Sequence, residues 1–399
     1  MSEPHRVPSS RDRGRVVGGM VAVAILLACS EAPRAAAAPP RGEPYGRLAD
    51  GREARTYVLE ADGGWRATLT DHGAALVSFV VPQRSTADGE PVDVVLGFDT
   101  LEAALAKRTS LGAVCGRCAD RIATATFDLD GAMHRLTAND GMNHARGGRQ
   151  GFDTRLWRAS PRSTARGAGV SFELVSPGGD EGYPGTLTAR VSYTLTPTGS
   201  LMVEMSATSD APTIVNLAHR CFWNLAGHAS GSIAGHELAV EADRYLPVGP
   251  DGIPTGAFAP VAGTPFDFRP ERRPWRPCGA AIETLPPDAP PGTPRGVDHT
   301  YLVRGWKPDG RLRTVARLRD PASGRSLEVR SDQPAVYVGM GGEFDGRLVG
   351  KDGAAYEPNA GICLGPWKYP DAVHHVDWPS VRLDPGQVAT HVTVYHFTR

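Results

Sequence analysis

The feature that most constrains this chain is a two-residue alternation of apolar and polar side chains in short runs. It is clear in "TLTARVSYTLT" (186–196), "SLMVEMSAT" (200–208) and "HVTVYHF" (391–397). This period places every second side chain on the same face of a β-strand. Turns separate the runs, in keeping with the 47 Gly and 34 Pro of the chain. One amphipathic stretch, "TLEAALAKRT" (100–109), predicts a short helix.

The strand-like runs follow one another at hairpin spacing, without the strand–helix–strand rhythm that a parallel sheet requires. The sequence therefore predicts an all-β fold, a large antiparallel β-sandwich. We expect no linker to interrupt residues 56–399 and find no fixed-period repeat in them, so they are expected to form one domain. A polar segment rich in Pro and Gly, residues 39–55, is expected to be a linker.

The N-terminal residues 1–38 have the features of an export signal. Four arginines precede an apolar run, "VVGGMVAVAILLA" (16–28), which has the length of a signal-peptide core and is too short to span a bilayer. Two endings remain open. "LLAC" (26–29) resembles a lipoprotein signal, in which Cys29 would be acylated, whereas "RAAAAPP" (34–40) offers a small-residue cleavage site near Ala38. Both endings predict an exported protein, periplasmic or extracellular, and the first adds a lipid tether to a membrane surface.

Charge and cysteine content argue against several other classes of function. The formal net charge is -1, which gives no electrostatic basis for binding nucleic acid. The motif "CGRC" (115–118) has no second CxxC to complete a four-thiolate site. Residues three apart in a strand also point to opposite faces. We therefore expect buried thiols, with no metal and no cofactor.

Several segments, in order along the chain, resemble the aldose 1-epimerase (galactose mutarotase) family. The segments that carry the resemblance are "DVVLGFDTLEAAL" (93–105), "GRCADRIATATFDLDG" (116–131), "NHARGGRQGFDTRLW" (143–157), "DEGYPGTLTARVSYTLT" (180–196), "VNLAHRCFWNLAG" (215–227), "ADRYLPVGPDGIPTGAFAPVAGTPFDFR" (242–269), "GVDHTY" (296–301) and "GICLGPWKYPDAV" (361–373). The resemblance covers nearly all of the chain that follows the export signal.

The resemblance implies a large β-sandwich whose concave face binds a hexose and interconverts its α and β anomers. In the family, a Glu takes the proton of the C1 hydroxyl while a His protonates the ring oxygen. The ring opens, C1 turns, and the ring closes from the other face. A second His, an Arg and an Asp hold the sugar. The expected partner is thus a small-molecule sugar.

Two family positions are kept in this sequence. Arg121, in "ADRI", falls on the Arg that binds the sugar, and its planar guanidinium can bridge two hydroxyls. Asp298, in "GVDH", falls on the Asp that accepts hydrogen bonds from hydroxyls. Asp120 stands where the family has Asn, beside Arg121. The alternative for these residues is an ion pair that only supports the fold.

Three family positions are changed. The resemblance places Arg146 at the sugar-contacting His, Arg220 at the acid and Gly365 at the base. Arginine stays protonated at physiological pH, and glycine has no side chain, so neither can move a proton. A positioned general acid or base is worth roughly 10²–10⁴ in rate. The sequence therefore predicts either weakened catalysis or catalysis by other residues.

Other residues can be considered as substitutes. His144 and His219 are the candidate proton carriers, against the plainer alternative that each imidazole only supports the fold. Trp367 is a candidate to stack on the sugar ring, and Glu343 is a further candidate base.

Three functions remain open on this basis. The first is an aldose 1-epimerase that acts on a hexose. The second is a catalytically impaired carbohydrate-binding protein on the same scaffold. The third is a diverged enzyme acting on an acidic sugar, which the arginines 121, 146 and 220 would favour.

Overall fold

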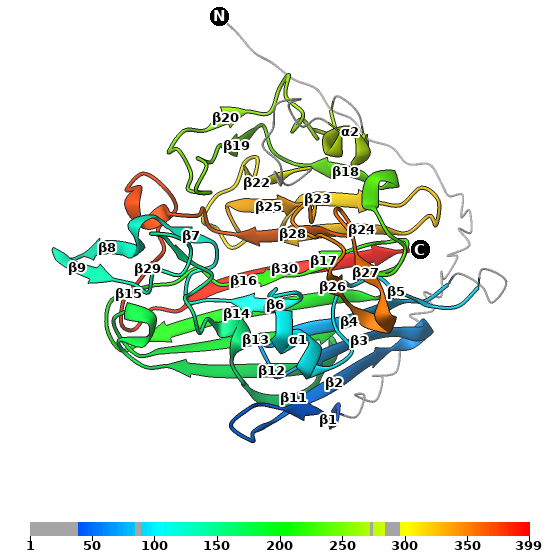
Figure 1. The fold of residues 1–399 in the computed structure, drawn as a ribbon, viewed down its shortest axis with the longest axis horizontal. Helices are drawn as coiled ribbons and strands as arrows, with labels where there is room; N and C mark the ends of the chain where they lie inside the picture. Colours follow the sequence, from blue (N-terminus) through cyan, green and yellow to red (C-terminus); the bar gives the residue numbers. More distant parts are fainter. Residues whose placement is uncertain (1–38, 84–88, 108, 272–273, 284–295) are drawn as a thin grey trace, which may run out of the picture. The chain divides into compact units, whose positions relative to one another are not determined.

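Antiparallel sheets make up most of the regular secondary structure in the described residues, as the alternation predicts (Figure 1). The computed structural model describes residues 39–399 except 84–88, 108, 272–273 and 284–295. The predicted export signal, including Cys29, lies outside the described residues. Within the described part of the chain, no helix is long and apolar enough to cross a membrane.

The largest sheet has nine strands. In spatial order they are β11 (Arg158–Thr164), β12 (Gly167–Ser176), β13 (Leu187–Leu195), β14 (Ser200–Ser209), β30 (Ala389–Thr398), β24 (Ser326–Ser331), β23 (Arg313–Arg319), β18 (Glu237–Val240) and β21 (Arg276–Pro277). The C-terminal strand β30 pairs with both β14 and β24, so it is an interior strand that joins the two halves of the sheet.

Two smaller sheets complete the main architecture. A five-stranded sheet runs in chain order through β1 (Gly42–Arg47), β2 (Glu53–Ala61), β3 (Trp65–Thr70), β4 (Ala75–Val81) and β5 (Val92–Asp93). A six-stranded sheet has the order β17 (Phe222–Trp223), β28 (Ile362–Trp367), β25 (Ala335–Gly339), β22 (Asp298–Leu302), β19 (Arg244–Leu246) and β20 (Ala259–Pro260).

Among the described residues, short two-stranded ladders, two α-helices and several single-turn 3-10 helices account for the other regular elements. The ladders are β6 (Ala113–Cys115) with β16 (Ala218–Arg220), β7 (Arg121–Ile122) with β10 (His144–Ala145), β8 (Thr126–Leu129) with β9 (Ala132–Arg135), β15 (Thr213–Ile214) with β29 (Arg382–Leu383), and β26 (Leu348–Val349) with β27 (Ala355–Tyr356). The helices are α1 (Leu101–Lys107), where the sequence predicts one, and α2 (Gly279–Ile282).

The segment 39–55 is not the linker that its composition suggests. It contains β1 and the start of β2, which pair with each other in the five-stranded sheet. The physical reason is local: β2 alternates buried and exposed side chains, and Gly46 bends β1 so that Leu101 of α1 packs against it. Gly42, Pro44 and Gly46 lie in β1, which is an edge strand, where a missing N–H donor is tolerated.

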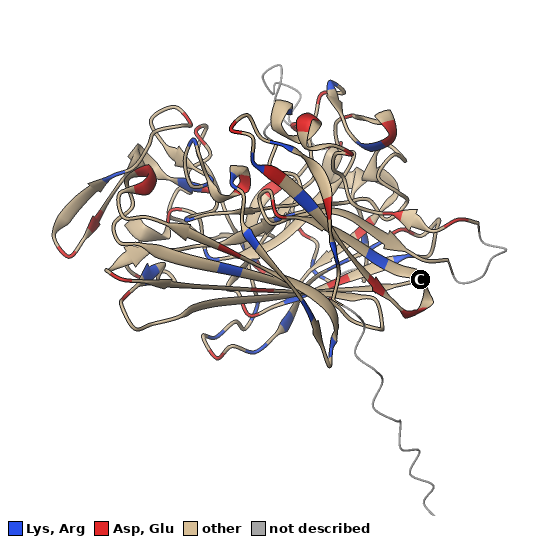
Figure 2. Cartoon of the chain, turned by 90° about the horizontal axis from the view of Figure 1, so that it is seen from below, with Lys and Arg blue, Asp and Glu red and all other residues tan. Residues whose placement is uncertain are grey.

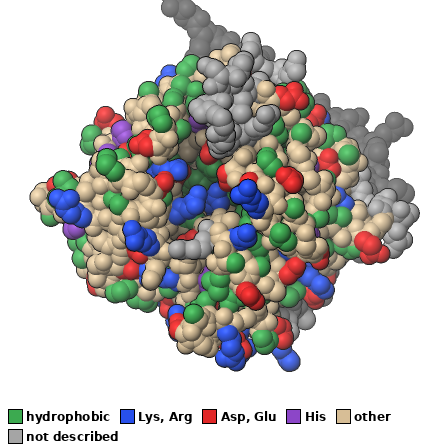
Figure 3. All heavy atoms as spheres, in the orientation of Figure 1, with side chains coloured by type: hydrophobic (Ala, Val, Ile, Leu, Met, Phe, Trp, Pro, Cys, Tyr) green, Lys and Arg blue, Asp and Glu red, His purple; other side chains and the backbone are tan. Residues whose placement is uncertain are grey.

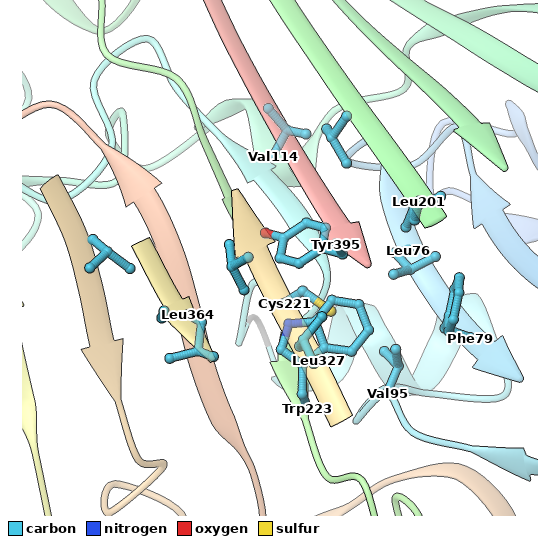
Figure 4. Close-up of a cluster of buried hydrophobic side chains, with 14 of the residues drawn as sticks. Leu76, Phe79, Val95, Val114, Leu201, Cys221, Trp223, Leu327, Leu364 and Tyr395 are labelled. Atoms are coloured by element: carbon cyan, nitrogen blue, oxygen red, sulfur yellow. The ribbon is translucent and has the colours of Figure 1, made fainter. Parts of the chain in front are cut away.

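The main hydrophobic core lies where strands of all three sheets meet. Phe79 of β4 stacks on Phe397 of β30, with ring centroids 4.4 Å apart, and contacts Trp223 of β17 edge-on at 6.2 Å. Figure 4 shows this cluster, in which Tyr395 lies beside Trp223. Alternate side chains of the long strands are buried here, so the two-residue period of the sequence is the period of the core.

Candidate active site

Three neighbouring strands of the six-stranded sheet form the floor of a cleft. Their register aligns Asp298 of β22 with Gly339 of β25 and Cys363 of β28, and it aligns Tyr337 with Gly365. Because residues two apart share a face, these side chains project on the same side of the sheet. The cleft above this floor has a volume of about 950 Å³ and is lined by Asp298 and Tyr337, among others.

The ladders β7–β10 and β6–β16 supply the arginines of the cleft. Arg121, Arg146 and Arg220 all line it, together with Asp120 and Trp367. The sequence-predicted binding residues, which are far apart in the chain, therefore meet around one cavity. Figure 3 shows basic side chains gathered around a hollow near the middle of this face.

Arg121 is held in place by two carboxylates and a glycine. Its Nε donates to Asp140 Oδ2 at 2.7 Å, and its Nη1 lies 3.8 Å from Asp120 Oδ1. Burial lowers the pKa of Arg121, but Asp120 and Asp140 more than offset this, so the guanidinium stays charged. Gly252 has φ +74°, and a Cβ there would lie 2.7 Å from Arg121 Cζ. The guanidinium thus occupies space that only glycine leaves open.

Arg220 is paired across the cleft with an acidic residue of the loop after β25. Its Nη2 donates to Glu343 Oε1 at 3.0 Å, and its Nη1 donates to the Thr109 carbonyl at 2.9 Å. The guanidinium also lies 4.8 Å from the centre of the Phe222 ring. Burial lowers the pKa of Arg220, but Tyr337 and Glu343 outweigh it and leave the pKa above its ordinary value. Arg220 is therefore a fixed cation.

Arg146 is the least constrained of these cations. Its backbone is left-handed, with φ +52°, and its N–H donates to the Asp120 carbonyl at 2.9 Å. The side chain is exposed. None of the residues that the structure describes forms a hydrogen bond or ion pair with its guanidinium. Arg146 can therefore turn toward a ligand in the cleft without breaking a contact.

An aromatic ring covers the backbone at position 365. A Cβ on Gly365 would lie 2.2 Å from Cζ3 of Trp367, two residues later on the same face of β28. The indole is only 4% exposed and stacks on Tyr337, with centroids 4.9 Å apart and planes 22° apart. The stacked pair is an apolar surface on the cleft floor, of the kind on which the C–H face of a sugar can rest.

Comparison with known proteins identifies the scaffold. The sequence profile described as "Aldose 1-epimerase" matches residues 55–396. The galactose mutarotase of Bos taurus is 41% identical over 342 residues, which cover 86% of this chain and 93% of that protein. The chain belongs to the aldose 1-epimerase family. Membership of this family supports the interconversion of sugar anomers in general, with a small-molecule sugar as the partner.

More distant relatives and solved structures agree. The aldose 1-epimerase of Escherichia coli (strain K12) is 33% identical over 350 residues, 87% of this chain and 96% of that protein. A GalM/aldose epimerase homologue from C. elegans has a similar structure, with a TM-score of 0.76 at 28% identity over 87% of this chain and 99% of that one. The galactose 1-epimerase of Lactobacillus acidophilus gives a TM-score of 0.75 at 25% identity, over 90% and 98%.

The two histidines considered as proton carriers do not line the cleft of this family member. His144 is fully buried, and its ring nitrogens contact the Thr137 carbonyl and the Tyr183 hydroxyl, both at 2.7 Å. His219 is 2% exposed, and its Nδ1 lies 3.4 Å from the Tyr395 hydroxyl. Burial lowers the pKa of both imidazoles, that of His219 to about 3. Each therefore stays neutral inside the fold. His219 alternates with Arg220 on β16, and His144 pairs with Ile122 and not with Arg121, so neither imidazole shares a face with those arginines.

The charge of the cleft is balanced. Its lining holds four arginines (Arg121, Arg146, Arg149 and Arg220) and five acidic residues (Asp120, Asp140, Asp153, Asp298 and Glu343). Basic and acidic residues are likewise interspersed along the rest of the chain (Figure 2). The expectation of an anionic ligand weighed the arginines against Asp298 and Asp120 alone. It did not include Asp140 and Glu343, which pair with Arg121 and Arg220.

Two cleft residues were not found by sequence reasoning. Asp140 orients Arg121, and Tyr337 pairs with Gly365 and forms the floor beneath the arginines. Asp140 lies in the turn "NDGMN" (139–143), where its type is explained equally well by turn formation. Tyr337 belongs to the alternating run "AVYVGM" (335–340), but only the register with β28 places it opposite Gly365.

Proposed function

We propose that this protein binds a neutral hexose in the cleft and interconverts its α and β anomers. The observation that carries the proposal is the meeting of Arg121 and Asp298, 177 positions apart in the sequence, at one cavity of about 950 Å³. Arg121 offers a planar donor, Asp298 offers an acceptor, and the Tyr337–Trp367 pair offers an apolar surface. A sugar has polar hydroxyls and an apolar C–H face, so convergent polar groups beside an aromatic surface suit it.

Polarimetry of freshly dissolved α-D-glucose and α-D-galactose tests this function. The protein is expected to speed the approach to the equilibrium rotation in proportion to its concentration. Asp298→Asn should reduce that effect by weakening the hold on the hydroxyls. A folded protein that leaves both sugars at the rate of buffer would refute the proposed activity.

A second candidate has a specific observation in its favour. The indole of Trp367 covers Gly365, so the position that the resemblance assigns to the base carries no proton acceptor. A carbohydrate-binding protein without catalysis would retain Arg121 and Asp298 for the same contacts. Calorimetry with the same sugars separates the two candidates, because binding without acceleration would identify the impaired form.

We also propose that the chain is exported by the signal in residues 1–38, with Cys29 as the acylated residue of the mature protein. The apolar run before "LLAC" and the arginines before it support this. Expression with labelled palmitate in a bacterial host is expected to label the wild-type protein and not Cys29→Ala. Label-free protein in the soluble exported fraction would favour cleavage near Ala38 instead.

A further inference from the structure

We propose that Glu343 is the general base of this cleft and that Arg220 holds the charge that develops on the ring oxygen. This inference rests on the proposed function, since it assigns roles within anomer interconversion. In this assignment the base is not at position 365 of β28. It is a carboxylate in the loop that follows β25. The geometry points to it in three steps.

The first step is the location of Glu343. It lies in the loop that follows β25 and lines the cleft. Its side chain is 43% exposed, so a substrate can reach the carboxylate, and its Oε1 lies 3.0 Å from Arg220 Nη2. The ion pair with Arg220 holds the carboxylate at the cleft, beside the cation that is assigned to the ring oxygen.

The second step is the position of this carboxylate relative to Gly365. Tyr337 is the register partner of Gly365, and Cys363 is two residues before it on the same face. Burial raises the pKa of both Tyr337 and Cys363, and the nearby carboxylates of Asp298 and Glu343 raise them further. Glu343, Tyr337 and Trp367 all line the same cleft, so the carboxylate faces the cavity whose floor lies at Gly365.

The third step is that the other carboxylates lining the cleft have other partners or roles. Asp140 accepts from Arg121 at 2.7 Å, and Asp153 accepts from the Ser110 hydroxyl at 2.5 Å. Burial raises the pKa of Asp120, which disfavours its ionised form. Asp298 is the acceptor for sugar hydroxyls in the proposed function. Glu343 is then the carboxylate whose cationic partner, Arg220, stands at the position where the family has its acid.

The chemistry balances with these two groups and one water. Glu343 takes the proton of the C1 hydroxyl, the O–H electron pair becomes the C1 carbonyl bond, and the bond from C1 to the ring oxygen breaks. The ring oxygen leaves with the electron pair, and Arg220 stabilises its negative charge by hydrogen bonds without giving up a proton. The proton on Glu343 passes through the water to that oxygen. Rotation about the C1–C2 bond and the reverse sequence give the other anomer.

The test compares Glu343→Gln with a matched control, Asp345→Asn, which removes a carboxylate from the same loop but lies outside the cleft lining. Turnover is measured by polarimetry and sugar affinity by calorimetry. Since Glu343 is exposed, both variants should fold, which thermal unfolding verifies. We expect Glu343→Gln to lose roughly 100-fold or more in kcat while its affinity changes little. Asp345→Asn should keep wild-type turnover.

Three outcomes overturn the assignment in different ways. If wild-type protein is active and Glu343→Gln keeps its kcat, Glu343 is not the base, although the proposed function stands. If Glu343→Gln and Asp345→Asn lose activity equally, the loop acts through its structure and not through this carboxylate. If the wild-type protein binds the sugar and does not accelerate exchange, the proposed function and the assignment both fail.

Discussion

The ring of Trp367 lies over Gly365, so that a Cβ at position 365 would be 2.2 Å from Cζ3 of the indole. The two residues are neighbours on one face of β28, and the indole is fixed by its stacking on Tyr337. The glycine and the tryptophan therefore form a unit: the tryptophan fits because the glycine has no side chain. Restoring an acidic residue at 365 has to remove this ring as well.

We predict that Gly365→Glu alone destabilises the protein by about 1–3 kcal/mol, because it overpacks a filled site. Gly365→Glu with Trp367→Gln should recover most of that loss, since the smaller side chain frees the space above β28. Urea unfolding of the two single variants and the double variant measures the coupling. Additive effects of the two substitutions would show that the rings do not exclude a side chain at 365.

The packing of Trp367 over Gly365 should also limit how far family-type catalysis can be restored. A variant with Arg146→His, Arg220→His and Gly365→Glu is expected to stay weakly active while Trp367 remains. Adding Trp367→Gln should raise mutarotation above that of the triple variant, because the new carboxylate can then project into the cleft. Polarimetry at equal folded concentration compares them. A fully active triple variant would contradict the steric account.

Sugar affinity should depend on the shape of the Arg121 side chain and not only on its charge. Arg121→Lys is expected to bind hexoses roughly tenfold more weakly, a loss of about 1.4 kcal/mol, because an ammonium cannot bridge two hydroxyls. Gly252→Ala should also weaken binding, since its Cβ would displace the guanidinium. Arg190→Lys, on the nine-stranded sheet, serves as the control. Equal calorimetric affinities for all of these proteins would exclude Arg121 from the site.

Sequence patterns predict features that form within one segment, but not contacts between segments that are far apart in the chain. The strands and the helix at Leu101–Lys107 follow from alternation and amphipathicity within single segments. The meeting of Arg121 with Asp298 follows from resemblance to a family. The cover over Gly365 and the pairing of Arg220 with Glu343 follow from neither, because they depend on register and on a loop 123 residues away from Arg220. Composition alone does not separate an edge strand from a linker, and for this reason it does not predict β1 in residues 39–55.

His144 is expected to matter for stability and not for turnover. His144→Ala removes a ring that bonds to the partly buried Thr137 carbonyl and to the buried Tyr183 hydroxyl, so both groups lose this partner. We expect a loss of about 1–3 kcal/mol in the free energy of unfolding. The kcat per folded molecule should be unchanged in polarimetry. A large fall in kcat with normal stability would return His144 to the list of proton carriers.

The buried imidazole of His219 should make the fold sensitive to acid. Burial lowers its pKa to about 3 in the folded protein, with a smaller effect from His391, while an unfolded His titrates near 6.5. Between these values only the unfolded chain binds the proton, so stability is complete above about pH 6.5 and falls as the pH drops toward 3. The slope for this one group is about 1.4 kcal/mol per pH unit.

Denaturant unfolding at several pH values measures this contribution. His219→Phe is expected to flatten the fall in stability between about pH 6 and pH 4 relative to the wild-type protein, because it removes one proton-binding site of the unfolded state. His391, whose pKa burial lowers to about 4, should continue to contribute in both proteins. Identical pH slopes would mean that His219 is not buried in its neutral form.

The most direct measurement of the central claim is two-dimensional NMR exchange spectroscopy on ¹³C-labelled glucose at anomeric equilibrium. With wild-type protein, we expect exchange peaks between the α and β C1 signals that grow with protein concentration. With Glu343→Gln at the same concentration, we expect line broadening from binding but no exchange peaks. Absence of exchange peaks with a wild-type protein that binds the sugar would contradict the claim that this cleft interconverts anomers.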